Sequence, residues 1–240
     1  MLIKIIKTEG VITMNGTLYG LGVGPGDPEL MTLKAIRILT EQDYVAVPSE
    51  KPLESVAYQI ALTAYPKLEE KEIISLSMPM SHNRDELNQY HQRAAEKIES
   101  YLRLGKSIVF LTLGDPTVYS TFGYVEKIVA SHGFPTQFVS GVPSFCAAAA
   151  KLNLPLSLWN EGIHIIPGIH TINTLPETGT CIIMKSGKNL PLVKDMLKTT
   201  GRDAFMVENC GMKNEQIYEH LDDFPDSSGY FSLIISPSPS

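Results

Sequence analysis

The stretch LTLGDPTVYSTF at residues 111–122 decides the fold, because it ends an apolar run with an acid held between glycine and proline. The run before the turn, SIVFLTLG (107–114), is typical of a central parallel strand that is covered on both faces. A second stretch, YGLGVGPGDPELMTLKA (19–35), repeats Gly-Asp-Pro after another apolar strand. Both turns are typical of a tight connection between a strand and a helix.

Strands and helices alternate along the first half of the chain. Periodicity predicts strands over 16–24, 44–48, 71–80 and 107–114, and helices over 27–42, 53–64 and 84–104. Asp27 and Pro28 are predicted to cap the first of these helices. This alternation predicts a parallel sheet with right-handed crossovers.

The pattern changes after the second Gly-Asp-Pro turn. A helix over 122–132 and the short strand TQFVS precede GVPSFCAAAAKLNLPL (141–156), which predicts a small-residue helix. Later strands are expected at 163–168, 180–186, 204–209 and 230–235, with a helix over 189–199 and a disordered SPSPS tail. The predicted fold class is α/β with two different domains, 15–120 with a parallel sheet and 121–240 with a mixed sheet.

Composition excludes several classes of function. The 240 residues are 43% hydrophobic and 19% charged, which is ordinary for a globular protein. No run approaches the roughly 20 apolar residues of a membrane span, and MLIKIIKTEGVITM is too short and too charged for a signal peptide. The first clear strand is expected just after Met14, which makes this residue a candidate for an alternative start. The net charge of −6 argues against nucleic acid as the main partner.

The cysteines and histidines do not predict a metal site. Cys146, Cys181 and Cys210 are far apart, without a CxxC pair, and the six histidines show no HxxxH or HExxH spacing. We expect all three thiols to be reduced and the protein to be cytoplasmic.

The glycine-rich turns do not suit a phosphate group. The alternating glycines at positions 20 to 26 do not fit GxGxxG, Pro25 removes one N–H donor, and Asp27 adds a negative charge. A cationic and apolar ligand would suit the turns better, because Asp27 and Asp115 favour positive charge and Tyr119 offers an aromatic face. Two aspartates that only cap their turns remain the alternative.

Three stretches together, GLGVGPGDPELMTLKA, LTLGDPTVYSTF and VSGVPSFCAAAAKLNLPL, resemble the tetrapyrrole (corrin and porphyrin) methyltransferases in order and spacing. The resemblance runs from about Gly16 to Ile235. Within that family, members that methylate C-20 of precorrin-2 or cobalt-precorrin-2 are the most similar, and YFSLII near the end adds to this likeness. The residues before Met14 and the SPSPS ending depart from the pattern.

The resemblance implies a homodimer that binds S-adenosylmethionine in a cleft between two α/β domains, with no protein-bound metal. It implies methyl transfer to the C-20 meso carbon of an anionic tetrapyrrole in cobalamin biosynthesis, with the cobalt-containing substrate favoured. Matched motif by motif, the expected cofactor contacts are Pro25, Leu113, Gly114, Asp115, Val118, Pro143, Ser144, Lys185 and Cys210.

The roles of the remaining candidates depend on the chemistry of this reaction. An in-line displacement needs alignment more than a strong base, so Tyr119 is either a polar group near the methyl or a wall of the pocket. The substrate carboxylates need cations, for which Lys51, Arg84 and Lys188 are candidates besides Lys185. Each of these cations also fits a solvated surface charge.

Other functions stay open at this point. Methylation could fall on another tetrapyrrole position, or on a protein or ribosomal RNA. A non-catalytic tetrapyrrole carrier would not need the two glycine-rich turns. A nucleotide-binding regulator would need a phosphate cradle, which the sequence does not show.

Overall fold

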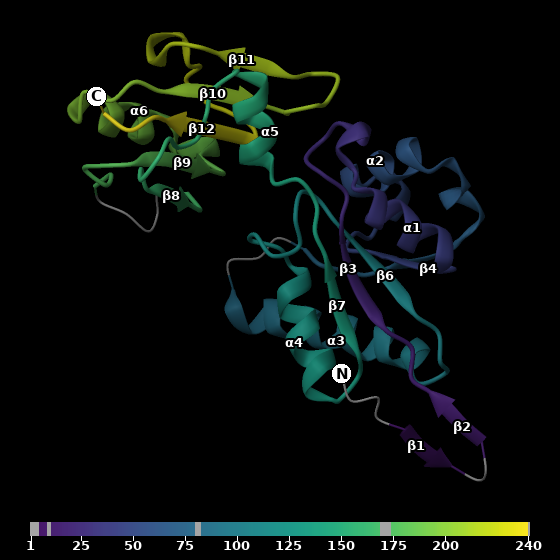
Figure 1. The fold of residues 1–240 in the computed structure, drawn as a ribbon. Coiled ribbons are helices and arrows are strands. Elements are labelled where there is room, and N and C mark those ends of the chain that lie inside the picture. Colours follow the sequence, from purple (N-terminus) through teal and green to yellow (C-terminus); the bar gives the residue numbers. More distant parts are fainter. Residues whose placement is uncertain (1–4, 9–10, 80–82, 169–173, 240) are drawn as a thin grey trace. The chain divides into compact units, whose positions relative to one another are not determined.

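A computed structural model describes residues 5–8, 11–79, 83–168 and 174–239. Residue contacts divide the chain into two compact units, residues 1–142 and 143–240. Each unit has its own five-stranded sheet, and the ribbon in Figure 1 follows both. The expected division into two α/β domains is therefore found.

The sheet of the first unit is parallel throughout, in the order β5-β4-β6-β3-β7. Its strands are β3 (Leu18–Gly22), β4 (Tyr44–Val47), β5 (Glu72–Ser75), β6 (Ile108–Thr112) and β7 (Thr136–Val139). Every residue of β6 is buried, as its unbroken apolar sequence predicts for a central parallel strand.

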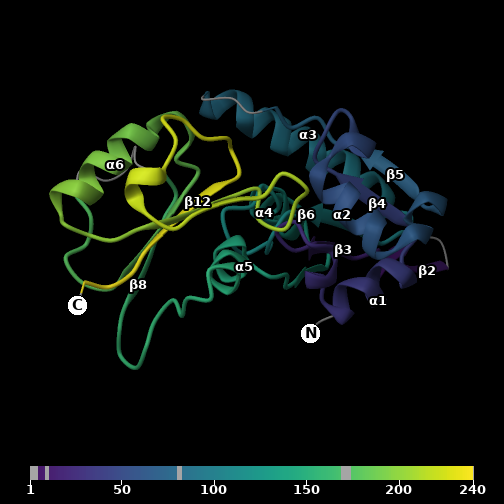
Figure 2. The ribbon, with the colours of Figure 1, turned by 90° about the horizontal axis from the view of Figure 1, so that it is seen from above.

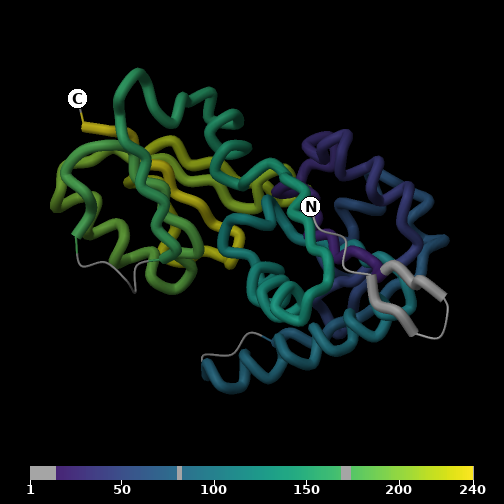
Figure 3. The backbone as a smooth tube through the Cα atoms, turned by 60° about the horizontal axis from the view of Figure 1, so that its bottom comes forward, coloured from purple at the N-terminus to yellow at the C-terminus, as the bar shows by residue number. Residues whose placement is uncertain are grey.

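Helices cover both faces of this sheet. Side chains alternate along each strand, so Leu21 and Val109 pack on one face with α1 (Leu33–Glu41) and α2 (Val56–Ala64). Leu18 and Phe110 pack on the other face with α3 (Arg84–Leu102) and α4 (Phe122–Ser131). Figure 2 shows β3 and β6 between α1 and α3. Helix α3 is 19 residues long, and Figure 3 traces its backbone.

Capping residues set the helix starts, and they correct one prediction. Asp27 accepts a hydrogen bond from the Glu29 N–H (2.9 Å) and caps only the short 3₁₀ turn η1 (Pro28–Leu30). The α-helix begins afterwards, where the Thr32 hydroxyl accepts from the Ala35 N–H at 3.1 Å. The predicted helix over 27–42 is therefore two elements, because Met31 and Thr32 have extended backbones.

The boundary predicted at 120/121 differs from the observed division at 142/143. Strand β7 pairs in parallel with β3, from Leu18 opposite Thr136 to Leu21 opposite Val139. Helix α4 is therefore the crossover between β6 and β7. The change of pattern after the Gly-Asp-Pro turn lies within the first unit, not at its end.

The second unit has a mixed sheet in the order β11-β10-β12-β9-β8. Its strands are β8 (Ile163–Ile166), β9 (Thr180–Met184), β10 (Phe205–Glu208), β11 (Gln216–Tyr218) and β12 (Ser232–Ser236). Only β8 and β9 run in parallel. Helix α6 (Leu190–Thr199) packs on the core face with Ile183, Met206 and Ile234.

Two predictions for the second unit are corrected. The helix expected within 141–156 is only α5 (Ser144–Lys151), and residues 152–162 follow it without regular structure. The tail is not disordered at its start, because Ser236 ends β12 with no exposed surface. The buried Arg202 guanidinium donates to the carbonyls of Ser236 (3.2 Å) and Pro237 (2.8 Å), which fixes this end of the sheet.

Smaller elements complete the chain. Strands β1 (Ile5–Thr8) and β2 (Val11–Met14) form an antiparallel hairpin before the first unit's sheet. The strand predicted over 71–80 ends at Ser75, and residue 80 lies outside the described residues. The other 3₁₀ turns among the described residues are η2 (Pro52–Glu54), η3 (Pro66–Glu70), η5 (Gly187–Asn189) and η6 (Leu221–Asp223).

Candidate functional site

The two glycine turns that the sequence singles out are hydrogen-bonded to each other. They follow β3 and β6, which are neighbours in the first unit's sheet. The Gly114 N–H donates to the Gly24 carbonyl at 2.8 Å, and the Gly24 N–H donates back to the Gly114 carbonyl at 3.3 Å. Both residues have left-handed backbones, with φ of 79° and 72°, a conformation that glycine adopts readily. The two turns therefore form one structure at the carboxyl edge of the sheet.

A third loop, which follows β7, packs against these turns backbone to backbone. A Cβ atom added to Gly141 would lie 2.2 Å from the Gly114 carbonyl oxygen, and one added to Gly22 would lie 2.5 Å from the same atom. Only glycine fits at these two positions. At Gly114 itself, an added Cβ would meet a single atom, the Val142 carbonyl oxygen, at 4.0 Å. The space that a side chain at position 114 would occupy is therefore open.

Asp115 links two of these loops through its carboxylate. One oxygen accepts hydrogen bonds from the Thr117 N–H (2.8 Å) and the Thr117 hydroxyl. The other accepts from the Gly141 N–H at 2.9 Å. Asp115 is 8% exposed, so the acid between glycine and proline has a structural role within the loops. Its contact with a cofactor stays a prediction.

Exposed apolar side chains surround the same edge. Leu33, Leu53, Tyr119 and Tyr124 are 48–90% exposed, and each follows the carboxyl end of a parallel strand or begins the next helix. Tyr124 stacks on His91 of α3, with ring centroids 4.8 Å apart and planes 8° from parallel. Burial lowers the pKa of His91, which favours the neutral ring. This rim would suit the apolar face of a flat ligand.

Sequence reasoning found only Tyr119 of this rim. Leu33, Leu53 and Tyr124 were missed because each belongs to a segment that reads as an ordinary amphipathic helix. The available signal was the position of Leu33 directly after a capping threonine, outside the buried face formed by Ala35, Ile38 and Leu39.

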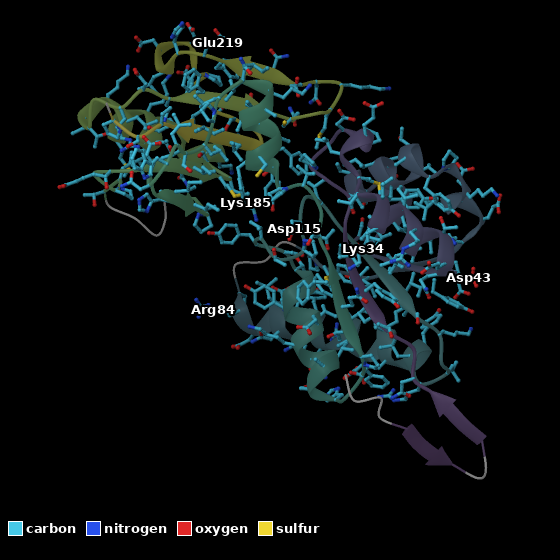
Figure 4. All side chains as sticks on the ribbon, in the orientation of Figure 1. Lys34, Asp43, Arg84, Asp115, Lys185 and Glu219 are labelled. Atoms are coloured by element: carbon cyan, nitrogen blue, oxygen red, sulfur yellow. The ribbon has the colours of Figure 1, made fainter. Side chains whose placement is uncertain are left out.

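The predicted substrate cations of the first unit differ in surroundings. Lys51 follows β4 and forms an exposed ion pair with Glu54, 3.2 Å between Nζ and Oε2. Arg84 begins α3 and is exposed, and Figure 4 shows its side chain extending away from the strands. Both lie in connections at the carboxyl edge of the sheet. The charge of Lys51 is already paired within the chain.

Two predicted residues of the second unit lie just after strands: Lys185 directly follows β9, and Cys210 is the second residue after β10. Lys185 comes after β9 with φ of 57°, and its N–H donates to the Ser232 carbonyl at 3.3 Å. Its ammonium lies 5.3 Å from the centre of the Tyr230 ring. Cys210 is buried and follows Asn209, which also has a left-handed backbone with φ of 51°.

Three buried hydroxyls lie near the same part of the second unit. Ser186, Ser228 and Ser232 have no hydrogen-bond partner among the described residues. Ser186 directly follows Lys185, and the backbone carbonyl of Ser232 accepts the hydrogen bond from the Lys185 N–H. The exposed Lys188 lies in η5, just beyond. Sequence reasoning nominated the lysines but missed the serines, whose burial it could not foresee.

The remaining predicted residues are distributed between the units. The first unit holds Pro25, Leu113, Gly114, Asp115, Val118 and Tyr119, and the second holds Pro143, Ser144, Lys185, Lys188 and Cys210. Pro143 and Ser144 begin α5, and Pro25 is buried beside Gly24. The first group comes together at one edge of one sheet.

The described residues contain no group of three His, Cys, Asp or Glu side chains that could hold a metal ion. The three cysteines are free thiols. Burial raises the pKa of the Cys181 thiol, against a smaller lowering by Arg202, so this thiol is a poor nucleophile.

Across the described ranges, no helix is long and apolar enough to span a bilayer.

The family model of the tetrapyrrole (corrin/porphyrin) methylases matches residues 17–224. The chain belongs to this family, which confirms the resemblance seen in the three sequence stretches.

Two curated relatives share almost their whole length with it. A probable cobalt-precorrin-2 C(20)-methyltransferase of Methanocaldococcus jannaschii is 36% identical over 226 residues, 91% of this chain and 94% of the relative. A cobalt-precorrin-2 C(20)-methyltransferase of Salmonella typhimurium is 30% identical over 233 residues, 92% and 96% of the two chains.

Solved structures share the fold at lower identity. A cobalt precorrin-4 methyltransferase superposes with a TM-score of 0.72 at 19% identity, covering 92% of this chain and 94% of the other. Uroporphyrin-III C-methyltransferase of Thermus thermophilus, solved with S-adenosyl homocysteine, gives 0.65 at 24% identity, with 92% and 97% covered. These likenesses support the two-unit α/β fold.

Proposed function

We propose that this protein transfers a methyl group from S-adenosylmethionine to C-20 of cobalt-precorrin-2. The observation that carries the proposal is the match to cobalt-precorrin-2 C(20)-methyltransferases over more than nine-tenths of both chains. A precorrin-2 C(20)-methyltransferase of a Sinorhizobium species is also similar, at 27% identity. The proposed enzyme is a cytoplasmic homodimer, in keeping with the sequence resemblance.

The carboxyl edge of the first unit's sheet fits the proposed cofactor. Ligands of open α/β sheets gather at this edge, and the open side of Gly114 leaves room for close approach. Pro25 lacks an N–H, and Asp27 and Asp115 are acidic, so the loops favour a sulfonium cation over a phosphate. In the second unit the proposed contacts are Pro143, Ser144, Lys185 and Cys210, with backbone groups supplying several of them.

The proposed chemistry needs little from the protein beyond alignment. When bound, S-adenosylmethionine supplies an activated methyl group on its sulfonium. The meso carbon of a reduced tetrapyrrole is an enamine-like nucleophile, so the side chains need only hold the two reactants in line. The apolar rim of Leu33, Leu53, Tyr119 and Tyr124 would support the macrocycle. Lys51, Arg84 and Lys188 are the proposed partners of its carboxylates.

Calorimetry tests the cofactor. We expect S-adenosylhomocysteine to bind the purified protein, and NAD and ATP, as matched adenosine-containing controls, not to bind. Tight binding of NAD or ATP without binding of S-adenosylhomocysteine would contradict the proposal, because it would require the phosphate cradle that the turns lack.

Mass spectrometry tests the substrate. The protein is incubated with S-adenosylmethionine and precorrin-2, with and without cobalt in the ring. We expect one methyl group to be added at C-20, faster with cobalt. If only a different tetrapyrrole is methylated, such as uroporphyrinogen III, the protein is still a tetrapyrrole methyltransferase, but the proposed methylation at C-20 of cobalt-precorrin-2 is wrong. Binding of the macrocycle without any methylation would favour the carrier.

A further inference from the structure

Tyr124 and His91 form a stacked aromatic pair near the point where two helices of the first unit begin. Tyr124 is the third residue of α4, and His91 lies about two turns into α3. Each helix follows a strand of the parallel sheet, so both begin at the edge that holds the glycine turns. The ring centroids are 4.8 Å apart, and the planes are 8° from parallel. The phenol ring of Tyr124 is therefore supported on one face by a second helix.

The two rings differ strongly in exposure. His91 is 8% exposed, whereas Tyr124 is 61% exposed. Because His91 covers one face of the phenol ring, the opposite face is left to solvent. Burial lowers the pKa of His91, which favours an uncharged supporting ring. A ring that is already held in one orientation loses little further freedom when a flat ligand stacks on it, so binding costs less entropy.

A cation lies on the same side of α3 as the supporting histidine. Arg84 is the first residue of α3 and precedes His91 by two helical turns, about 10 Å along the axis. Arg84 is exposed (Figure 4) and forms no ion pair with another of the described residues. Lys51, in contrast, is paired with Glu54. The acidic residues 85 and 86 lie on other sides of the helix.

We propose that Tyr124 and Arg84 dock the tetrapyrrole substrate at two points. A conjugated face of the macrocycle stacks on the free face of Tyr124, and one peripheral carboxylate pairs with Arg84. His91 is a positioning residue, because it contacts Tyr124 and not the substrate. The inference rests on the proposed function, in which the substrate is a flat macrocycle that carries carboxylates. A stacking face and a cation at this spacing select a flat anion over a neutral apolar ligand.

An equilibrium titration measures the docking without turnover. The full-length protein is saturated with S-adenosylhomocysteine, and its binding of cobalt-precorrin-2 is followed by the visible absorption of the macrocycle. Tyr124→Ser removes the ring and should weaken binding about tenfold, whereas Tyr124→Phe keeps the ring and should bind as the unaltered protein does. Arg84→Gln should weaken binding about fivefold at low salt and less at high salt, because salt screens an exposed ion pair. In turnover, Tyr124→Ser and Arg84→Gln should raise KM and leave kcat nearly unchanged.

His91 is tested through its effect on Tyr124. His91→Ala leaves the phenol ring without support and should weaken macrocycle binding about threefold, and His91→Phe restores a stacked ring and should recover the affinity. If His91 were only structural, His91→Ala would lower stability without changing the affinity for the macrocycle. Circular dichroism confirms that each variant is folded, and calorimetry confirms that it still binds S-adenosylhomocysteine.

Helix α3 offers a matched control pair of the same two residue types. The Arg93 guanidinium lies 5.9 Å from the centre of the Tyr90 ring, and neither residue shares the side of α3 that carries Arg84 and His91. Tyr90→Ser and Arg93→Gln should therefore leave macrocycle binding unchanged. If Arg93→Gln weakens binding as much as Arg84→Gln does, the cations only attract a polyanion in general, and the two-point docking is wrong.

The outcomes separate this inference from the proposed function. If the unaltered protein binds and methylates cobalt-precorrin-2, but Tyr124→Ser or Arg84→Gln binds it equally tightly, the two-point docking is wrong and the proposed function stands. If His91→Ala keeps full affinity, the positioning role of His91 is wrong. If the unaltered protein binds neither S-adenosylhomocysteine nor the macrocycle, the proposed function fails, and the docking inference fails with it.

Discussion

Both units have residues with a left-handed backbone just after their strands, but the types of residue at these positions differ between the units. In the first unit, the left-handed positions at the ends of β3 and β6 are glycines, Gly24 and Gly114. In the second unit, the corresponding positions after β9 and β10 are Lys185 and Asn209. Tyr119 is the one non-glycine residue with positive φ among the described residues of the first unit.

The difference shows at which positions backbone packing permits only glycine, and at which positions a side chain is possible. The first unit's turns touch backbone to backbone, so a Cβ cannot be placed at Gly22 or Gly141. A left-handed backbone costs a residue other than glycine roughly 1–2 kcal/mol. Tyr119 and Lys185 keep side chains at this cost, and strained residues of this kind cluster at functional sites.

The largest expected effect comes from adding one methyl group to Gly141. In Gly141→Ala the new Cβ would lie 2.2 Å from the Gly114 carbonyl oxygen and 2.9 Å from Gly22 Cα. Backbone atoms on both sides cannot rotate away, so we expect the free energy of unfolding to fall by about 3 kcal/mol or more. Denaturant titration measures this change.

Gly123→Ala is the matched control. An added Cβ there meets nothing within 4 Å, and the residue lies in α4, so stability should rise by up to about 1 kcal/mol. If Gly141→Ala does not lower the free energy of unfolding, the three loops are not packed as described.

A smaller loss is expected when Asp115 becomes asparagine. All three donors around the carboxylate need acceptors, and Asn offers one oxygen where Asp offers two. One backbone N–H then faces the NH₂ group of the asparagine, which cannot accept its hydrogen bond. The free energy of unfolding should therefore fall by about 1–3 kcal/mol. Asp27→Asn is the control, because its single bond to Glu29 survives. Unchanged stability combined with lost binding of S-adenosylhomocysteine would instead make Asp115 a ligand contact.

Tyr119→Phe tests whether the side chain at the strained position of the first unit does chemistry. If the macrocycle supplies the nucleophile, only a hydroxyl contact is lost, at roughly 0.5–1.5 kcal/mol or about tenfold in rate. A general base would contribute 10²–10⁴-fold. Single-turnover rates with both ligands saturating separate the two cases. A loss beyond about a thousandfold with intact binding would make Tyr119 a catalytic base.

The sequence predicted most of the fold because its evidence is local. Apolar runs such as 107–114 and helix caps such as Asp27 are read directly from neighbouring residues. Pairing between distant strands is not, which explains why β7 was assigned to the wrong side of the boundary. The three residues of β11 are too few to show a period.

The site was predicted in part, and for a similar reason. The two Gly-Asp-Pro turns predicted that the candidate residues of the first unit share one edge of the sheet, since such turns end parallel strands. The Asp115 bond to Gly141 joins residues 26 positions apart, and no local pattern reveals it. The tail was misread because SPSPS has a disordered composition, while its order depends on the guanidinium of Arg202, 34 residues earlier.

The smallest expected effect concerns Lys185, where glycine replaces a strained side chain. In Lys185→Gly, relief of the left-handed backbone (about 1–2 kcal/mol) is offset by glycine's entropy (about 0.5–1 kcal/mol) and by the lost contact with Tyr230 (about 0.5–1 kcal/mol). Thermal unfolding should therefore show a change within about 1 kcal/mol. Lys185→Ala loses the same contact without the relief, and should be the less stable of the two. If the proposed cofactor contact is made by backbone, both variants should bind S-adenosylhomocysteine as the unaltered protein does. If both lose binding while Lys188→Ala does not, the ammonium of Lys185 is itself the contact, and the side chain is retained at a strained position because the ligand requires it.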